Sequence, residues 1–248
     1  MYDKIKYLPA GDKAVVMEFG NEISKEINAK IRNLVKAADE AKIEGIEEIL
    51  PTYRSVQIMY DPLKIDYSEL VNKLEMLSSK TVEGQKEKIK IIEIPTLYGG
   101  EYGPDINFVA EHNKLTTDDV IKIHTGTDYL VYMLGFTPGF SYLGGMSESI
   151  ATPRLASPRT KIPAGSVGIA GSQTGMYPSE TPGGWQLIGR TPVKLYDSKK
   201  EPPVLLSAGD YVRYVSITEE EYNEILKQVQ EDKYEVNVII SEGGELRE

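Results

Sequence analysis

The residues best suited to bind a small molecule lie between Arg154 and Arg190, a segment rich in glycine and proline that holds the only tryptophan. Arg154 and Arg159 carry planar guanidinium groups, which match a carboxylate or a phosphate. Nearby prolines restrict the backbone, so these cations are not on a flexible tail. Aromatic side chains with a few polar groups are typical of small-molecule pockets. The predicted substrate-binding set is Arg154, Arg159, Gln173, Thr174, Tyr177 and Trp185.

The same segment also has simpler interpretations. Its regularly spaced glycines suit tight barrel corners as well as a loop close to a ligand, and its arginines could pair with neighbouring acids at a solvated rim. A nucleotide loop is disfavoured, because Gly175 is followed by Met176 and Tyr177 where a P-loop requires Lys and then Ser or Thr. A ligand of another kind remains compatible with the pattern.

A second candidate surface is the apolar loop LGFTPGFSYLGG at 134–145. Its three aromatic residues form either a buried plug or an exposed contact patch. We expect a wall of the binding pocket or an interface with a partner protein rather than plain core. The predicted interface residues are Phe136, Phe140 and Tyr142.

Groups for metal binding or nucleophilic catalysis are scarce. The chain has no cysteine, which excludes a thiolate nucleophile and Cys-ligated zinc. Its two histidines, His112 and His124, do not lie in a metal-binding motif such as HExxH. We expect both to be ordinary residues near helix ends, with no metal site and no Ser-His-Asp nucleophile. The general base is left unassigned.

Composition limits the class of partner. The 248 residues include 28 Lys and Arg against 38 Asp and Glu, a net charge of −10. This charge argues against binding to nucleic acid or to an anionic membrane surface. The first 20 residues lack the apolar core of a signal peptide, and no apolar run approaches the ~18 residues of a membrane span. A cytoplasmic protein is the default expectation.

Hydrophobic periodicity predicts two domains, at 1–85 and 86–248. The first has the order β-α-β-β-α, and 89–94 could supply its last strand, as in the split β-α-β, ferredoxin-like arrangement. A polar linker is expected over 80–88. The second has two short helices, a β-rich part that indicates a barrel or sandwich, and a late helix that begins at Thr218. Three helix starts carry a capping pattern, an N-cap residue followed three positions later by an acidic residue: Asp66 in the first domain, and Thr116 and Thr218 in the second. Its expected strands are 129–134, 167–170, 185–188, 193–196, 204–206, 211–215 and 234–240.

Four stretches together resemble the KipI/PxpB family, which includes proteins described as allophanate hydrolase subunit 1. They are YGGEYGPD (98–105), VYMLGFTPGFSYLGG (131–145), the long segment 151–197 and AGDYVRY (208–214). The resemblance extends over essentially the whole chain. It implies an α+β protein with an N-terminal ferredoxin-like domain followed by a C-terminal cyclophilin-like β-barrel.

The resemblance also implies a function. Similar proteins act with a PxpC/KipA-type subunit and a PxpA (LamB/YcsF-type) subunit as an ATP-dependent 5-oxoprolinase, which opens 5-oxo-L-proline, a small carboxylate, to L-glutamate. The ATP site is expected in a partner or at an interface, because this chain lacks a phosphate loop. Two alternatives stay open: a module that inhibits a sporulation histidine kinase, and a carboxyltransferase half of a urea carboxylase or allophanate hydrolase-type system.

Overall fold

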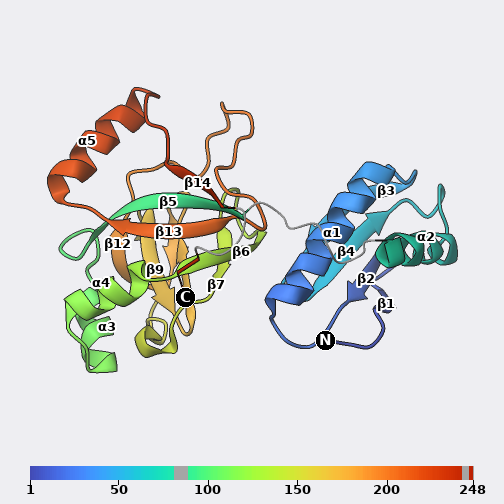
Figure 1. The fold of residues 1–248 in the computed structure, drawn as a ribbon, viewed down its shortest axis with the longest axis horizontal. Coiled ribbons are helices and arrows are strands. Elements are labelled where there is room, and N and C mark those ends of the chain that lie inside the picture. Colours follow the sequence, from blue (N-terminus) through green and yellow to red (C-terminus); the bar gives the residue numbers. More distant parts are fainter. Residues whose placement is uncertain (81–88, 242–245, 248) are drawn as a thin grey trace. The chain divides into compact units, whose positions relative to one another are not determined.

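The computed structural model describes residues 1–80, 89–241 and 246–247. The chain divides into two compact units, Met1–Gln85 and Lys86–Glu248, which are drawn in Figure 1. Of the linker predicted over 80–88, residues 81–88 lie outside the described residues. The predicted α+β class is confirmed.

The N-terminal unit is built on a four-stranded antiparallel sheet with the order β1-β2-β4-β3. Strand residues alternate between a buried face and a more exposed one, as in β4, and the buried face meets both helices. The element order β-α-β-β-α predicted from the sequence is present as β2, α1, β3, β4 and α2. The strands are β1 (Lys6–Pro9), β2 (Ala14–Glu18), β3 (Ile46–Pro51) and β4 (Ser55–Tyr60).

Two capped helices cover this sheet, α1 (Lys25–Ala41) and α2 (Tyr67–Lys80). The Ser24 hydroxyl accepts a hydrogen bond from the backbone N–H of Ile27 at the start of α1. At the start of α2, Asp66 Oδ1 accepts one from the backbone N–H of Glu69 at 2.9 Å, which confirms the predicted cap.

The prediction that 89–94 completes the N-terminal sheet is wrong. These residues belong to β5 (Ile89–Tyr98), which pairs with strands of the second unit. The edge beside β2 is occupied by β1 instead, a short strand that the sequence did not reveal. The ferredoxin-like assignment of this unit stays a prediction.

The second unit is dominated by an eight-stranded sheet with the path β10-β9-β12-β5-β13-β6-β7, and β14 also pairs with β5. The end strands β10 and β7 lie against each other, so the sheet forms a nearly closed barrel. This agrees with the predicted β-barrel. The strands besides β5 are β6 (Asp128–Leu134), β7 (Ser141–Gly144), β9 (Ser166–Ala170), β10 (Gln173–Met176), β12 (Gln186–Arg190), β13 (Tyr211–Ser216) and β14 (Val238–Ser241).

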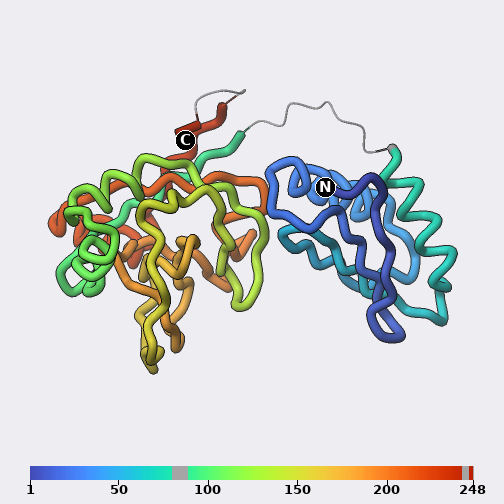
Figure 2. The backbone as a smooth tube through the Cα atoms, turned by 90° about the horizontal axis from the view of Figure 1, so that it is seen from below, coloured from blue at the N-terminus to red at the C-terminus, as the bar shows by residue number. Residues whose placement is uncertain are grey.

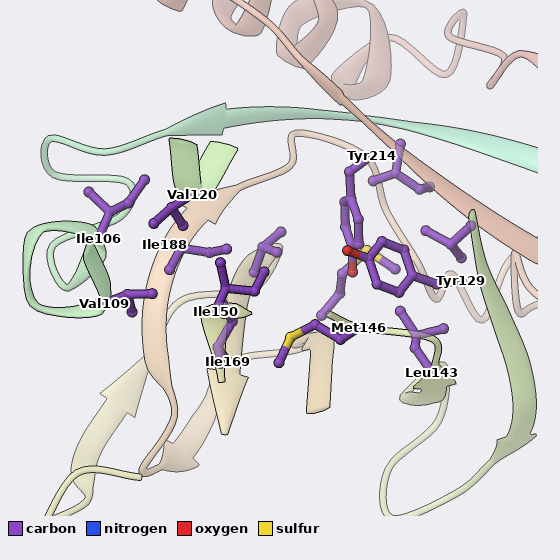
Figure 3. Close-up of a cluster of buried hydrophobic side chains, with 14 of the residues drawn as sticks. Ile106, Val109, Val120, Tyr129, Leu143, Met146, Ile150, Ile169, Ile188 and Tyr214 are labelled. Carbon is purple, nitrogen blue, oxygen red and sulfur yellow. The ribbon is translucent and has the colours of Figure 1, made fainter. Parts of the chain in front are cut away.

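Helices complete this barrel. α3 (Ile106–Asn113) and α4 (Thr117–Thr125) lie side by side (Figure 1, Figure 2), and α5 (Glu219–Gln230) contacts β5. The predicted capping boxes at Thr116 and Thr218 are both present. Figure 3 shows Ile106, Val109 and Val120 from the helices pointing toward barrel residues such as Ile188. Glu148–Ile150 forms a short 3₁₀ helix.

Several short elements differ from the sequence prediction. The expected strands 193–196 and 204–206 form only one isolated bridge, Tyr196 to Val204. The expected strand 234–240 is reduced to β14. Four short strands of this unit were not predicted, namely β7, which lies within the expected apolar loop 134–145, β10, and the separate two-stranded pair β8 (Arg159–Ile162) and β11 (Thr181–Gly183). Glycine and proline interrupt their hydrophobic pattern, which hides strands of three or four residues. None of the described helices has the length and apolar character needed to cross a bilayer.

Candidate functional site

Five aromatic residues from separate parts of the chain meet on one side of the barrel; we call them the aromatic cluster. Phe140 lies at the centre, with its ring centroid 5.2–6.2 Å from those of its four neighbours. The rings meet edge to face, a favourable arrangement for aromatic pairs. The cluster thus joins residues predicted for substrate binding with those predicted for a partner interface. Its members are Phe136, Phe140, Tyr142, Tyr177 and Trp185.

The cluster is buried at one end and open at the other. Phe140, Tyr177 and Trp185 are 5%, 3% and 9% exposed, whereas Phe136 is 71% exposed. Phe136 also has a φ of +65°, a left-handed conformation that is unusual for an aromatic residue. The loop therefore holds a large apolar side chain in solvent, beside a rigid aromatic floor.

Two glycines make room for this floor. A Cβ atom on Gly175 would lie 3.1 Å from the Trp185 ring, and one on Gly183 would lie 2.5 Å from the Tyr177 hydroxyl. Glycine therefore serves at these positions for the close approach of an aromatic side chain, a use that differs from the barrel corner and the ligand loop expected from the sequence.

Arg154 lies at the edge of the cluster as an exposed cation. Its guanidinium carbon is 6.0 Å from the centroid of the Trp185 ring, at the outer limit of a cation–π contact. None of the ion pairs among the described residues involves Arg154. Its guanidinium group can therefore accept an anionic ligand against an aromatic surface.

Arg159 has a different environment. Its Nη2 donates to Asp105 Oδ1 at 2.7 Å, and its Nη1 donates to the Trp185 carbonyl at 3.3 Å. The other oxygen of Asp105 accepts from the backbone N–H of Leu187 at 2.6 Å. Arg159 thus fixes the backbone beside Trp185 through a carboxylate that the sequence analysis did not single out. A direct contact of Arg159 with substrate stays a prediction.

Tyr177 lies close to both arginines. Burial raises the pKa of its hydroxyl, while a backbone hydrogen bond at Trp185 and the charges of Arg154 and Arg159 act in the opposite direction. Because burial is the larger influence, Tyr177 is a neutral phenol near pH 7 and can donate a hydrogen bond.

Gln173 and Thr174 are not brought to the arginines in the same way. Gln173 opens β10 opposite Ala170 and is half-buried. Thr174 is 1% exposed, and its hydroxyl lies 2.7 Å from Nε2 of His124. Successive strand residues face opposite sides, so Gly175 faces Trp185 while Thr174 faces the barrel interior. The structure therefore separates Thr174 from the rest of the predicted set.

His124 is the centre of a buried polar network that the sequence analysis missed. It lies in the last turn of α4, as predicted, but is fully buried. Its Nδ1 lies 2.7 Å from the Tyr98 hydroxyl, and its backbone carbonyl accepts from the Tyr129 hydroxyl at 2.8 Å. Burial lowers the pKa of His124 to about 3. The imidazole is therefore neutral and serves the barrel interior rather than the aromatic cluster.

We expect this neutral histidine to make folding sensitive to acid. The unfolded chain binds a proton at His124 near pH 6.5, whereas the folded chain does so only near pH 3. Stability is therefore lost as the pH falls through that window, by up to about 1.4 kcal/mol per pH unit. Urea unfolding followed by Trp185 fluorescence measures this slope. His124→Gln should flatten it relative to the exposed His112→Gln control, and equal slopes in the two variants would contradict the prediction.

A third arginine, Arg190, resembles Arg154 in lying over an aromatic ring. Its guanidinium carbon is 5.3 Å from the Tyr102 ring centroid, and Tyr102 packs on Tyr222 at 4.8 Å. Tyr102 belongs to the YGGEYGPD stretch. That loop lies close to β12, because a Cβ on Gly103 would overlap the Ile188 carbonyl. The stretch therefore contacts Arg159 through Asp105 and Arg190 through Tyr102, a pairing visible only in three dimensions.

The part of the chain that the structure describes contains no cluster of side chains suited to bind a metal ion. No group of three or more His, Asp and Glu side chains is placed there to hold an ion.

Comparisons with known proteins identify the family. Residues 5–206 match the family model described as carboxyltransferase domain, subdomain C and D. A Bacillus subtilis protein, named as the B subunit of 5-oxoprolinase, is 44% identical, with 86% of this chain and 93% of that protein covered. An Escherichia coli O157:H7 protein of the same name is 39% identical, covering 83% and 93%.

A solved structure gives a more distant likeness. The crystal structure of Kluyveromyces lactis urea carboxylase matches with a TM-score of 0.77 and 25% identity, covering 96% of this chain and 24% of that protein. The barrel and the helical elements described above thus occur within a much longer enzyme. The family model and the two bacterial relatives agree with this likeness, and the protein belongs to the carboxyltransferase-domain family, subdomains C and D, as a homologue of the proteins named as the B subunit of 5-oxoprolinase.

Proposed function

We propose that this protein is the PxpB-type component of an ATP-dependent 5-oxoprolinase, which opens 5-oxo-L-proline to L-glutamate together with other subunits. The observation that carries the proposal is the 44% identity to a protein named as a 5-oxoprolinase subunit, across 93% of that protein's length. The exposed guanidinium of Arg154 over Trp185 supports it, because the substrate combines a carboxylate with a compact apolar ring.

Each part of the site has a physical role in this proposal. Arg154 binds the substrate carboxylate, and Trp185 with Phe140 provides the apolar surface for the ring. Tyr177 is available to donate a hydrogen bond. Arg159, held by Asp105, fixes the backbone of Trp185. A lactam carbonyl is stabilised by resonance, so the reaction requires activation of its oxygen, which ATP supplies when bound.

The glycine-rich segment does not fit the phosphates of ATP. A phosphate loop joins a strand to a helix, so that backbone N–H groups at the helix N-terminus face the anion. Here Gly171 and Ser172 form a tight turn that joins the antiparallel strands β9 and β10, rather than a strand and a helix. We therefore propose that the ATP site lies in a partner subunit or at an interface.

The exposed end of the aromatic cluster suits a partner interface. Phe136 offers an apolar side chain beside Phe140 and Tyr142, and aromatic anchors are enriched at interface centres. We propose that a PxpC/KipA-type subunit covers this end and completes the site, with a PxpA-type subunit as third component. The chain alone is then inactive.

The test is glutamate release from 5-oxoproline and ATP by the three subunits, with each omitted in turn. We expect activity from the complete set only, because the site needs its partner. The proposal would be refuted if the complete, folded set releases glutamate and the same release is measured when this chain is left out.

A carboxyltransferase role is the second candidate, since the family model carries that description and the urea carboxylase structure shares the fold. It predicts carboxyl transfer to urea in the presence of biotin-carrier and biotin carboxylase polypeptides. The carboxyltransferase role would be favoured if the complete oxoprolinase set releases no glutamate and carboxyl transfer to urea is observed.

A further inference from the structure

A cavity separate from the aromatic cluster lies in the second unit, between the segment 193–205 and the chain around the end of α5. Its volume is about 260 Å³, just below the range for drug-sized ligands, so it suits a smaller molecule. None of its lining residues belongs to the predicted substrate-binding set or to the aromatic cluster.

The floor of the cavity is apolar and anchored in the barrel. Val193 and Val229 are 7% and 8% exposed, and Leu205 and Val236 pack against the main core. A floor of branched aliphatic side chains favours a ligand with an aliphatic group, since burial of that group removes apolar surface from water.

One wall is held in place before any ligand arrives. The backbone N–H of Asp197 donates a hydrogen bond to the Pro203 carbonyl at 2.8 Å, and the backbone N–H of Leu205 donates one to the Leu195 carbonyl at 3.0 Å. Oδ1 of Asp197 accepts from the backbone N–H of Lys199 at 3.0 Å, and this hydrogen bond lowers the pKa of the Asp197 carboxyl. The cavity therefore presents a fixed, ionised carboxylate, and little ordering is needed on binding.

The charged rim contains two loose ion pairs and one further carboxylate, that of Glu235. Lys194 Nζ lies 3.4 Å from Asp197 Oδ2, and Lys200 Nζ lies 3.8 Å from Asp232 Oδ1. By contrast, Arg159 Nη2 lies only 2.7 Å from Asp105 Oδ1 in the ion pair beside Trp185. Charge-assisted hydrogen bonds are normally about 2.7–2.9 Å, so the rim groups retain capacity for a ligand that carries both charges.

We propose that this cavity binds a small zwitterion with an aliphatic side chain, that is, an aliphatic α-amino acid. The ammonium and carboxylate of such a ligand lie on neighbouring atoms, so they can meet an aspartate and a lysine of the rim together. A simple carboxylate could pair with the lysines but would leave the aspartates without a cation. A simple amine could pair with the aspartates but would leave the lysines without an anion. Tyr234, whose pKa is raised by burial and by Glu93, adds a neutral hydrogen-bond donor to the lining.

The test is equilibrium binding of L-leucine to the full chain, measured by calorimetry with isovaleric acid and isopentylamine as single-charge probes. We expect saturable binding of L-leucine with a Kd of about 1 mM or below, and weaker binding of both single-charge probes. No saturable L-leucine binding, or equal binding of a single-charge probe, would overturn the proposal.

Two variants locate the binding. Lys200→Gln removes an exposed rim cation and should weaken L-leucine binding roughly five- to tenfold, while Val236→Phe should abolish it by filling the cavity. Lys73→Gln, at an exposed ion-paired lysine of the other unit, is the matched control. L-leucine affinity that is the same in Lys200→Gln and Lys73→Gln would place the ligand elsewhere and overturn the assignment. This test needs only the isolated chain, so it is independent of the proposed oxoprolinase activity.

Discussion

Replacing Arg154 by Ala is expected to lower kcat/KM for 5-oxoproline by about 10- to 150-fold in the assembled enzyme. The reason is that one guanidinium binds the substrate carboxylate, and a hydrogen bond to a charged group contributes about 1.5–3 kcal/mol. Arg154 is exposed and forms no ion pair with a described residue, so its loss should leave folding intact. Steady-state glutamate release by the three-subunit set measures the effect.

Two further variants separate charge from geometry. Arg154→Lys keeps the charge but loses the planar fork, so we expect an intermediate rate. Lys122→Ala removes an exposed cation on α4 of the same unit and should leave kcat/KM unchanged. Wild-type kinetics in Arg154→Ala would remove this residue from the site and direct attention to Arg190, another arginine over an aromatic ring.

The sequence singled out several residues of the aromatic cluster, but not the way in which they meet. Trp185 and Tyr177 were expected in a pocket and Phe136 at an interface, but only the fold shows that they meet around Phe140. Thr174 was misplaced because the short strand β10 was not recognised, so the alternation that turns its side chain inward could not be applied.

Residues that act through distant partners were not predictable from local patterns. Asp105 lies 54 positions from Arg159, and His124 lies 50 from Thr174, so no periodicity links either pair. A histidine at a helix end gives the same local signal whether it is exposed or buried. By contrast, the helix caps at Thr116 and Thr218 depend on residues three positions apart, and both were predicted correctly.

The N-terminal unit shows a similar limit. Strand β5 was assigned to the wrong sheet because its hydrophobic pattern predicts a strand but not its partners. Ten residues long, β5 pairs with β12, β13 and β14 of the barrel. Those strands come from 186–241, and the hydrophobic pattern of 89–94 carries no information about them.

The largest loss of stability is expected from Arg213→Met. Arg213 on β13 faces Asp128 on β6 and Glu93 on β5 across the sheet. It makes two hydrogen bonds to Asp128, at 2.7 and 2.8 Å, and the Asp128 side chain is fully buried. Removal of the arginine leaves a buried carboxylate without its cation, which costs about 3–5 kcal/mol.

Urea unfolding followed by Trp185 fluorescence measures this loss, because the only tryptophan belongs to the second unit. Lys161→Met breaks an exposed pair with Glu180 in the same unit and should cost less than about 1 kcal/mol. The double variant Arg213→Met with Asp128→Leu should recover much of the stability, since apolar residues can replace a buried pair at little cost. Recovery will be incomplete, because Asp128 Oδ2 also accepts a hydrogen bond from the backbone N–H of Arg247. If the double variant were as unstable as Arg213→Met, the loss would come from packing around Arg213 rather than from the uncompensated charge of Asp128.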